Sequence, residues 1–387
     1  MRTFRAGISL RILLVSAGLF PPDFAGGQLR VLKTFVRLRE RYSFSVSVLA
    51  LSGKLTHPGW SEVEGIRVRR LVDTGGVLSS FMATGLHLIS EKRAKVDVVY
   101  TLTTGRLVYI TVFWARLLRL PVVAEFINAN LEDTAARKAM VRFLAHSARL
   151  NIAISQPVAR QLRALGVPDE RIWVRPNPVD IETFKLPAAK VRADARRKLS
   201  IKDDQLLHIL VGSVETRKNQ ILGVEALEKL PSNHDLIIVG PVLPQNEAYA
   251  EDLRQKIAAS PARERIHLVD RFVDDIETYM YAADCLWMPS KEEGLGNVML
   301  EALCCGVPCI INRELGMDEH IMEMINGFQA QPNAHAWAEA ITAMLAIIKD
   351  VTARGRISQA AQSRYKARTF DDQFFAHMSE VANADKA

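Results

Sequence analysis

The chain has 387 residues, of which 49% are hydrophobic and 24% are charged, and its formal net charge is +7. This length allows two domains that each bury a core of their own. The composition is typical of a soluble globular protein, and no apolar run reaches the ~18 residues that a membrane-spanning helix needs. The four cysteines match no zinc-binding spacing, and we expect them to be small buried side chains in a reducing compartment.

The first half of the chain predicts an alternation of strands and helices. Residues 1–20 place three arginines before an apolar stretch, as a signal peptide does, but this stretch ends in Pro-Pro-Asp without a small-residue cleavage pattern. We therefore interpret residues 11–17 as a first buried strand, followed by a loop over 18–27 and a helix over 28–42. Further strands are expected at 45–50, 63–71, 96–102, 121–126 and 151–155. Such an alternation predicts a mostly parallel sheet.

Charge is distributed unevenly along the chain. Residues 1–175 contain 26 basic and 12 acidic residues, a net charge of +14, whereas residues 176–387 contain 24 and 31, a net charge of −7. Segments 28–42 and 105–120 interleave basic side chains with apolar or aromatic ones, which favours helices on an anionic membrane surface. The alternative is a buried helix whose Arg and Lys side chains reach outward to water. No nucleic-acid recognition motif is present.

A second αβ run begins at residue 206 and ends near residue 350. Its strands are predicted at 206–214, 235–239, 266–269, 285–289 and 308–312, and a last helix at 357–382 has no strand after it. The first of these strands ends in Gly212 and Ser213, and the pair Arg217 and Lys218 follows at the start of a helix. Taken alone, such a basic pair is equally typical of a solvated helix start.

The segment 290–308 reads S-K-E-E-G-L-G-N-V-M-L-E-A-L-C-C-G-V-P and places Glu293 and Glu301 around a glycine turn. Without Cβ atoms, the glycines of this turn let the backbone bend and approach a ligand closely. The amides at the start of the following helix would favour an anion such as a phosphate, and the carboxylates would accept hydrogen bonds from hydroxyl groups. A ligand with phosphate in the middle and hydroxyl groups on both sides is a nucleotide-sugar. The turn and the helix start comprise Gly294, Leu295, Gly296, Asn297 and Val298.

The two glutamates resemble the E-x7-E signature of retaining glycosyltransferases of family 4, which have the GT-B fold of two Rossmann-like parallel-sheet domains facing across a cleft. The resemblance implies that Glu293 contacts the donor sugar and that Glu301 binds the ribose. Lys218 falls on a lysine position that neutralises the departing diphosphate. Gly26 and Gly27 fall on a Gly-Gly pair near the donor. Segment 166–184 resembles the interdomain connection, with Pro178 in place of the usual glycine.

From this resemblance we expect an acceptor-side domain over 1–175, a linker over 176–193 and a nucleotide-sugar domain over 194–356. Residues 357–387 would then form a helix that crosses back to the first domain.

Two positions depart from the family pattern. Ser213 stands where the family has an arginine, so Arg217 is a candidate for the second cation. No histidine lies between His87 and His146, where many members have one near the donor sugar; Asn128 and Asn130 are polar groups in that loop.

There is no D-x-D, no P-loop and no G-x-G-x-x-G motif. We therefore expect no metal and no cofactor, the nucleotide-sugar being a substrate. With this resemblance, the sequence predicts a retaining hexosyltransferase. We expect it to extend a lipid-linked glycan in the synthesis of a cell-surface polysaccharide. It would act in the cytoplasm, peripherally at the inner face of the membrane. The alternatives are transfer to a soluble acceptor, or a pseudo-enzyme that binds nucleotide or glycan without turnover.

Overall fold

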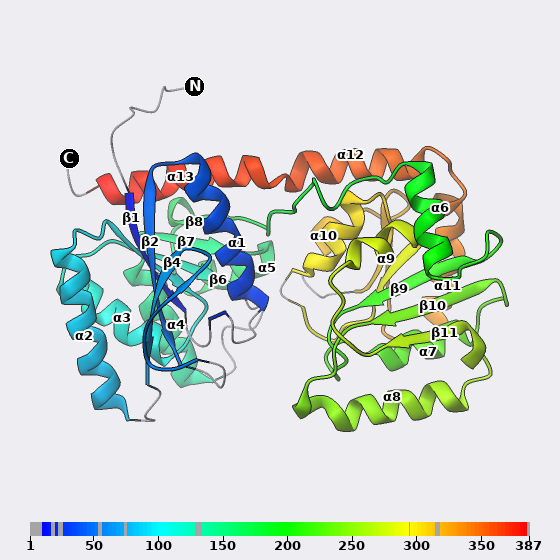
Figure 1. Ribbon diagram of the computed structural model, residues 1–387, viewed down its shortest axis with the longest axis horizontal. Helices are drawn as coiled ribbons and strands as arrows, with labels where there is room; N and C mark the ends of the chain where they lie inside the picture. Colours follow the sequence, from blue (N-terminus) through cyan, green and yellow to red (C-terminus); the bar gives the residue numbers. More distant parts are fainter. Residues whose placement is uncertain are drawn as a thin grey trace. The chain divides into compact units, whose positions relative to one another are not determined.

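The computed structural model describes residues 10–16, 20–21, 26–52, 56–72, 76–127, 134–293, 295–313 and 318–384, with backbone only at 26–30 and 318. The chain divides into two compact units (Figure 1). The first unit comprises Met1–Pro176 and Arg368–Ala387, and the second comprises Asn177–Ala367. Within the described ranges, we find no helix with the length and hydropathy needed to cross a bilayer.

The first unit contains an eight-stranded sheet in the order β3-β4-β2-β1-β5-β6-β7-β8. All neighbours are parallel except β3 and β4. The strands are β1 (Leu10–Ser16), β2 (Phe44–Leu51), β3 (Gly59–Val63), β4 (Ile66–Leu71), β5 (Val98–Leu102), β6 (Val122–Phe126), β7 (Leu150–Ala153) and β8 (Ile172–Val174). The single strand expected over 63–71 is thus wrong at its start, because Glu64 and Gly65 have φ of 50° and 70° and turn the chain into a hairpin.

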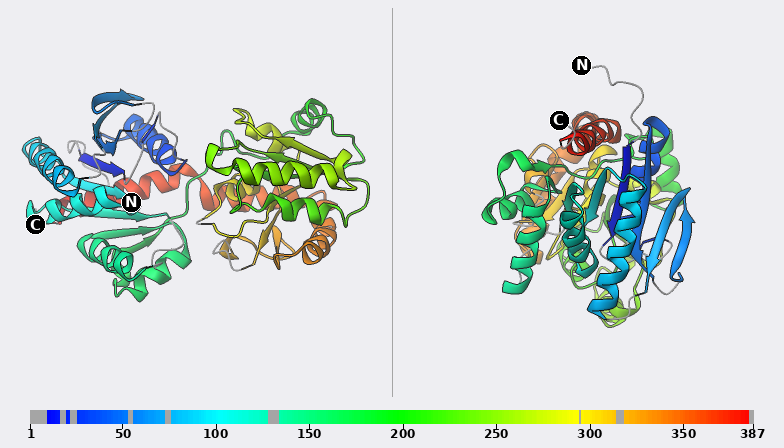
Figure 2. Two further views of the ribbon diagram at one scale, coloured as in Figure 1. Left: turned by 90° about the horizontal axis from the view of Figure 1, so that it is seen from below. Right: turned by 90° about the vertical axis from the view of Figure 1, so that its left-hand side faces the viewer.

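The helices of the first unit are α1 (Gly26–Arg41), α2 (Val77–Arg93), α3 (Arg106–Leu117), α4 (Ala135–Ser147), α5 (Gln156–Ala164) and α13 (Ala367–Asn383), the last from the end of the chain. Helices α3 and α4 pack on β1, β5 and β6, and α2 packs on α3 (Figure 2). Helix α1 begins two residues earlier than expected, so that Gly26 and Gly27 are its first residues and not loop residues.

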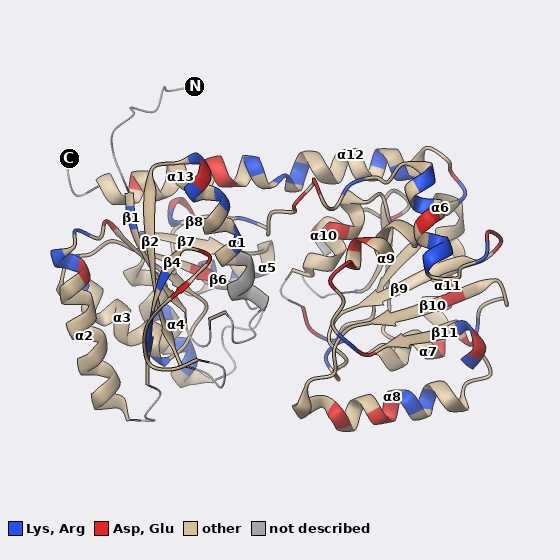
Figure 3. Cartoon of the chain, viewed as in Figure 1, with Lys and Arg blue, Asp and Glu red and all other residues tan. Residues whose placement is uncertain are grey.

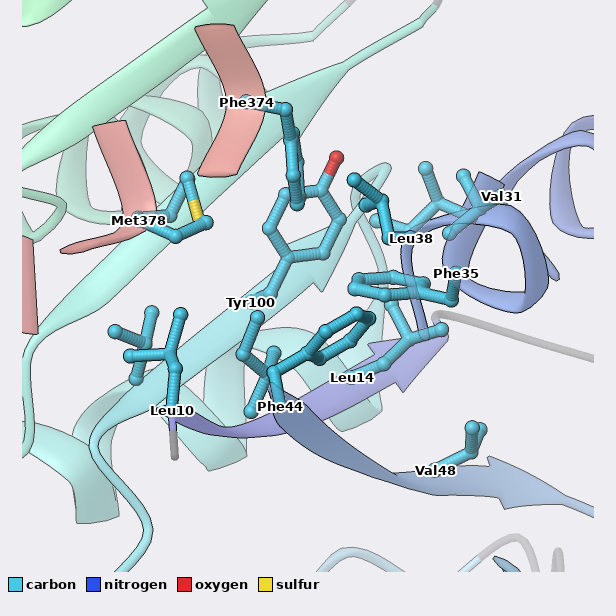
Figure 4. Close-up of a cluster of buried hydrophobic side chains, with 14 of the residues drawn as sticks. Leu10, Leu14, Val31, Phe35, Leu38, Phe44, Val48, Tyr100, Phe374 and Met378 are labelled. Atoms are coloured by element: carbon cyan, nitrogen blue, oxygen red, sulfur yellow. The ribbon is translucent and has the colours of Figure 1, made fainter. Parts of the chain in front are cut away.

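Helices α1 and α13 share one hydrophobic core over the first sheet (Figure 4). The ring of Phe35 on α1 lies 5.9 Å from Tyr100 of β5 and 5.7 Å from Phe374 of α13, between ring centroids. All three side chains are at most 1% exposed. The end of the chain therefore completes the core of the first unit, which confirms the crossing helix of the predicted fold.

The expected helix over 357–382 is two helices, α12 (Ala353–Tyr365) and α13. They are separated at Lys366, whose ψ of 121° ends the helical backbone. Val179 from the chain's entry into the second unit lies beside this break: its N–H donates to the Tyr365 carbonyl at 2.9 Å, and its carbonyl accepts from the Ala367 N–H at 3.3 Å. The backbone groups that the break leaves unpaired are thereby satisfied.

The second unit contains a six-stranded parallel sheet in the order β11-β10-β9-β12-β13-β14. Its strands are β9 (Leu206–Val211), β10 (His234–Val239), β11 (Ile266–Val269), β12 (Cys285–Met288), β13 (Cys309–Asn312) and β14 (Gly327–Ala330). Its other helices are α6 (Ala189–Lys198), α7 (Gln220–Leu227), α8 (Glu247–Ala259), α9 (Ile276–Ala282), α10 (Asn297–Cys304) and α11 (Ala334–Ile348). The strand order reverses between β9 and β12, and in open α/β sheets ligands bind at such a switch point.

The four cysteines, Cys285, Cys304, Cys305 and Cys309, are free and buried, as expected. Burial raises the pKa of the Cys304 thiol to about 12 and that of Cys309 well above its ordinary value, so these thiols stay neutral. They serve as small packing groups around β12, α10 and β13.

Candidate functional site

The loops that follow β9 and β12 meet at the switch point of the second sheet. The two strands are parallel neighbours, with Cys285 opposite His208, so their carboxyl ends lie at the same edge. The loop after β9 carries the basic pair of the sequence analysis, and the loop after β12 carries Glu293. The Lys291 N–H donates to the Arg217 carbonyl at 2.8 Å and joins the two loops through their backbones.

Gly212 allows the Lys218 side chain to lie across the end of β9. Its φ of 148° is favourable only for glycine, and a Cβ atom there would stand 3.1 Å from Lys218 Cε. The chain then turns tightly, with the Lys218 N–H donating to the Glu215 carbonyl at 2.9 Å. The lysine side chain is 13% exposed, and its Nζ donates to Glu293 Oε1.

Glu293 gathers both predicted cations. Arg217 Nη1 lies 3.3 Å from Glu293 Oε2, on the other oxygen from the one that Lys218 contacts. The guanidinium also binds Glu215 Oε1 at 2.8 Å and the Glu292 carbonyl at 3.1 Å. The Glu293 side chain is 9% exposed, so the contact is largely removed from water. The structure therefore brings Arg217, Lys218 and Glu293 together, although Ser213 carries no charge.

The start of α10 follows Glu293 closely along the chain, after Leu295 and Gly296. Gly296 has a φ of 69° and immediately precedes the helix, so the first turn of α10 has no side chain from that position to cap it. Its amides and the helix dipole offer a site for an anion. Leu295 is buried at 2% exposure and anchors the turn, while Asn297 is exposed.

Glu301 lies one turn after Asn297 on the same face of α10. It is half-buried, as are Val298 and Ser213. The Ser213 carbonyl accepts a hydrogen bond from Gln220 Nε2 at 2.9 Å, which fixes the backbone of the loop after β9.

The remaining predicted site residues belong to the first unit or lie outside the described residues. Gly26 and Gly27 begin α1 in the first unit. Gly294, Asn128 and Asn130 lie outside the described residues. The side chain of Glu125, which precedes that loop, is buried and accepts a hydrogen bond from the Tyr100 hydroxyl, so it anchors the first sheet.

One residue in contact with the site was not predicted from the sequence. Asn177 is 5% exposed and donates its Nδ2 to the Asn297 side chain at the start of α10. Its place between Pro176 and Pro178, which restrict the backbone, was the available signal.

No cluster of three His, Cys, Asp or Glu side chains with the arrangement of metal ligands occurs among the described residues. The site is instead built from two cations, the carboxylates of Glu215, Glu293 and Glu301, and a helix start. Such a set can bind a phosphate-containing ligand and hold its hydroxyl groups.

The chain matches two sequence families, one in each unit. Residues 25–183 match "Glycosyltransferase Family 4", and residues 191–364 match "Glycosyl transferases group 1". Among curated proteins, the chain is 29% identical over 237 residues to D-inositol 3-phosphate glycosyltransferase of Xylanimonas cellulosilytica, covering 58% of this chain and 54% of that protein. The chain thus spans about half the length of such relatives.

Two Escherichia coli proteins are also similar. UDP-Gal:alpha-D-GlcNAc-diphosphoundecaprenol alpha-1,3-galactosyltransferase is 26% identical, covering 62% of this chain and 64% of that protein. Lipopolysaccharide glucosyltransferase WaaG is 34% identical, covering 33% of each chain.

Solved structures share the fold over nearly the whole chain. Anabaena HepE, crystallised with UDP, superimposes with a TM-score of 0.81 at 20% identity, covering 96% of this chain and 100% of that one. Sucrose-phosphate synthase from Thermosynechococcus elongatus superimposes with a TM-score of 0.81 at 18% identity, covering 97% and 100%.

Proposed function

The chain belongs to family 4 of the glycosyltransferases and has the GT-B fold, and on this premise we propose that it is a retaining hexosyltransferase. It transfers a sugar from a nucleotide-sugar donor to a glycan, and the glycan is lipid-linked and destined for the cell surface. The reaction takes place at the cytoplasmic face of a membrane and uses no metal.

The observation that carries this proposal is the convergence of Arg217 and Lys218 on Glu293 at the switch point of the second sheet. A donor diphosphate placed between these cations and the start of α10 would draw Lys218 and Arg217 away from the carboxylate. Glu293 would then be available to accept hydrogen bonds from the sugar hydroxyls, and Glu301 on α10 to accept them from the ribose.

In the transfer, the bond between the anomeric carbon and the diphosphate oxygen breaks, and its electron pair stays on the diphosphate. The acceptor hydroxyl oxygen bonds to the anomeric carbon on the same face, and its proton passes to the departing phosphate. Negative charge therefore grows beside Lys218 and Arg217, whose fixed cations stabilise it.

A lipid-linked acceptor is supported by the net charge of +14 on residues 1–175, which favours an anionic partner. Two similar proteins, the galactosyltransferase acting on a diphosphoundecaprenol-linked sugar and WaaG, are named for lipid-bound acceptors. A soluble acceptor is the second candidate, because other relatives are named for D-inositol 3-phosphate. Binding without turnover is a third, motivated by Ser213 and the absent histidine.

The test starts with a thermal-shift screen of nucleoside diphosphates and nucleotide-sugars, since a ligand of the native state raises the melting temperature by mass action. Labelled sugar from the best donor is then offered to a lipid-diphosphate-linked sugar and to inositol phosphate. We expect transfer to the lipid-linked acceptor. Transfer only to inositol phosphate would contradict the proposed lipid-linked acceptor. Donor binding without any transfer would contradict the proposal that the chain is an active transferase.

A further inference from the structure

Three neighbouring helices of the first unit expose large apolar side chains. On α2, Leu78, Met82 and Leu86 follow one another at four-residue spacing and are 75%, 52% and 67% exposed. This spacing places them in one stripe along the helix. We call the exposed side of α2, α3 and α4 the α2–α4 face. Its large apolar residues are Val77, Leu78, Met82, Leu86, Phe113, Leu117, Met140 and Phe143.

The three helices are packed side by side (Figure 2), which places their exposed apolar residues on neighbouring elements. The Phe81 ring on α2 lies 5.4 Å from that of Phe113 on α3, and the Trp114 indole N–H donates to the Phe81 carbonyl at 3.0 Å. Gly85 permits this close approach, because a Cβ atom there would lie 2.4 Å from the Trp114 ring. Helix α3 in turn contacts α4.

The charge of the α2–α4 face has a single sign. Over their 42 residues the three helices carry seven basic side chains and one carboxylate, Glu91 (Figure 3). That carboxylate is turned inward, where it lies 3.7 Å from His87 and accepts a hydrogen bond from Ser47 at 3.3 Å. The basic residues are Lys92, Arg93, Arg106, Arg116, Arg137, Lys138 and Arg142.

The hairpin of β3 and β4 borders α2 with an exposed tryptophan. The Trp60 ring is 48% exposed and lies 5.7 Å from the His87 ring of α2. The Arg67 guanidinium lies over the same indole at 4.5 Å from its centroid. Trp beside Arg is typical of side chains at the level of lipid headgroups.

Helix α1, for which the sequence predicted membrane contact, makes its contacts inside the first unit instead. Its apolar side, including Val31, Phe35 and Leu38, is buried in the core. Arg37 binds Asp371 of α13 at 3.1 Å, and Arg41 binds Asp372 at 2.8 Å. The expectation of a membrane-binding helix over 28–42 is therefore wrong.

We propose that the α2–α4 face docks on an anionic bilayer, with its apolar side chains inserted among the lipids and its cations against the headgroups. The proposal rests on the proposed function, since a lipid-linked acceptor would lie in that bilayer. A second copy of the chain is a poor occupant: a two-fold contact would set seven cations against the same seven. A bilayer of anionic lipids supplies both the apolar interior and the opposite charge.

The test is sedimentation of the full chain with vesicles of pure phosphatidylcholine or with one-third phosphatidylglycerol. We expect binding to the anionic vesicles at least about tenfold stronger than to the neutral ones, and weakened by salt, which screens exposed charges beyond ~10 Å at 0.1 M. The triple variant Leu78→Ser, Met82→Ser, Leu86→Ser should lose about tenfold or more in affinity. A second triple variant, Arg137→Gln, Lys138→Gln, Arg142→Gln, should lose the preference for anionic lipid.

The matched control replaces three exposed apolar residues of the second unit, Met324, Ile325 and Val351, by Ser, and should bind vesicles as the wild type does. Unchanged vesicle binding by the α2 triple variant would overturn the proposal. So would a wild type that ignores vesicles, or one that forms dimers which the same variant dissociates. The affinity for the nucleotide-sugar donor is measured on every variant. A wild type that does not bind the donor would refute the proposed function. A variant that binds the donor but not the vesicles would show that membrane docking and donor binding are separate properties.

Discussion

Lys218 holds a positive charge at the end of β9, where the proposed reaction develops negative charge. Lys218→Ala should therefore lower kcat by ~10²-fold or more, the scale of losing one preorganised electrostatic group. Lys349→Ala, at an exposed position of the same unit, should leave kcat unchanged. Turnover at the wild-type rate in Lys218→Ala, measured with saturating donor, would refute the assignment.

Arg217 contacts the same carboxylate as Lys218 but is 41% exposed, against 13% for the lysine. If it supplies the charge missing at Ser213, Arg217→Ala should reduce kcat nearly as much as Lys218→Ala; a merely solvated arginine would give a small loss. If charge is what Arg217 supplies, Arg217→Lys should restore much of the kcat that Arg217→Ala loses.

Glu293 and Glu301 are predicted to bind different parts of the donor. Glu301→Ala should weaken both the nucleotide-sugar and the free nucleoside diphosphate, because the ribose is common to both. Glu293→Ala should weaken the nucleotide-sugar while the free nucleoside diphosphate binds as well as before or better, since the cations lose a competing carboxylate. Calorimetric titration of both ligands decides, and equal losses of free nucleotide affinity would contradict this division.

Strands β9 and β10 bury a pair of histidines that face each other in the second sheet. His208 Nε2 lies 2.8 Å from His234 Nδ1, and the His208 ring stacks on Trp287 at 4.5 Å between centroids. Burial lowers the pKa of His234 to about 4 and that of His208 well below its ordinary value. Both rings are therefore neutral in the folded chain at neutral pH.

The unfolded chain binds protons at these histidines near pH 6.5 and the folded chain does not. The contribution of the two neutral histidines to the free energy of unfolding is therefore fully present above pH 6.5. It should be lost as the pH falls from about 6.5 towards 4, at ~1.4 kcal/mol per pH unit for each such histidine. Urea unfolding at pH 7.5, 6, 5 and 4.5 tests this. His234→Gln should flatten the dependence, whereas His335→Gln, whose ring is 79% exposed, should not. A free energy of unfolding that is constant over this range would contradict it.

The elements that the sequence predicted are those with long apolar runs, such as β1, β9 and β12. Strand β8 was not predicted, because its three residues lie in segment 166–184, which was interpreted as the interdomain connection, and are paired only along one side. Strand β14 has only Phe328 and Ala330 as apolar residues besides glycine. It forms because its backbone pairs with β13. Such short strands depend on pairing with a neighbouring strand, which the hydrophobic periodicity and the residue propensities of the sequence do not encode.

For the site, the residues of each loop were predictable from local pattern, but their meeting was not. The ion pairs of Glu293 with Arg217 and Lys218 join positions about 75 residues apart. Only the strand order, with β9 beside β12, brings them together. The contact of Asn177 with Asn297 likewise depends on where the chain enters the second unit.

Helix α13, from the end of the chain, stabilises the unit in which the chain begins. Phe374 of α13 is 1% exposed against α1 and β5, so Phe374→Ala should lower the free energy of unfolding of the first unit by about 3–5 kcal/mol. Phe272→Ala, at a 67% exposed position, should change it by less than about 0.5 kcal/mol. Scanning calorimetry gives both values, and equal effects would show that α13 does not support the core.

We propose that the second unit binds a nucleotide-sugar at the switch point between β9 and β12. The most direct test is a crystal structure of the full chain with the nucleoside diphosphate that most raises its melting temperature. We expect the diphosphate within hydrogen-bonding distance of Lys218 Nζ and the first amides of α10, and the ribose hydroxyls on Glu301. A diphosphate bound elsewhere, with Lys218 still on Glu293, would contradict it.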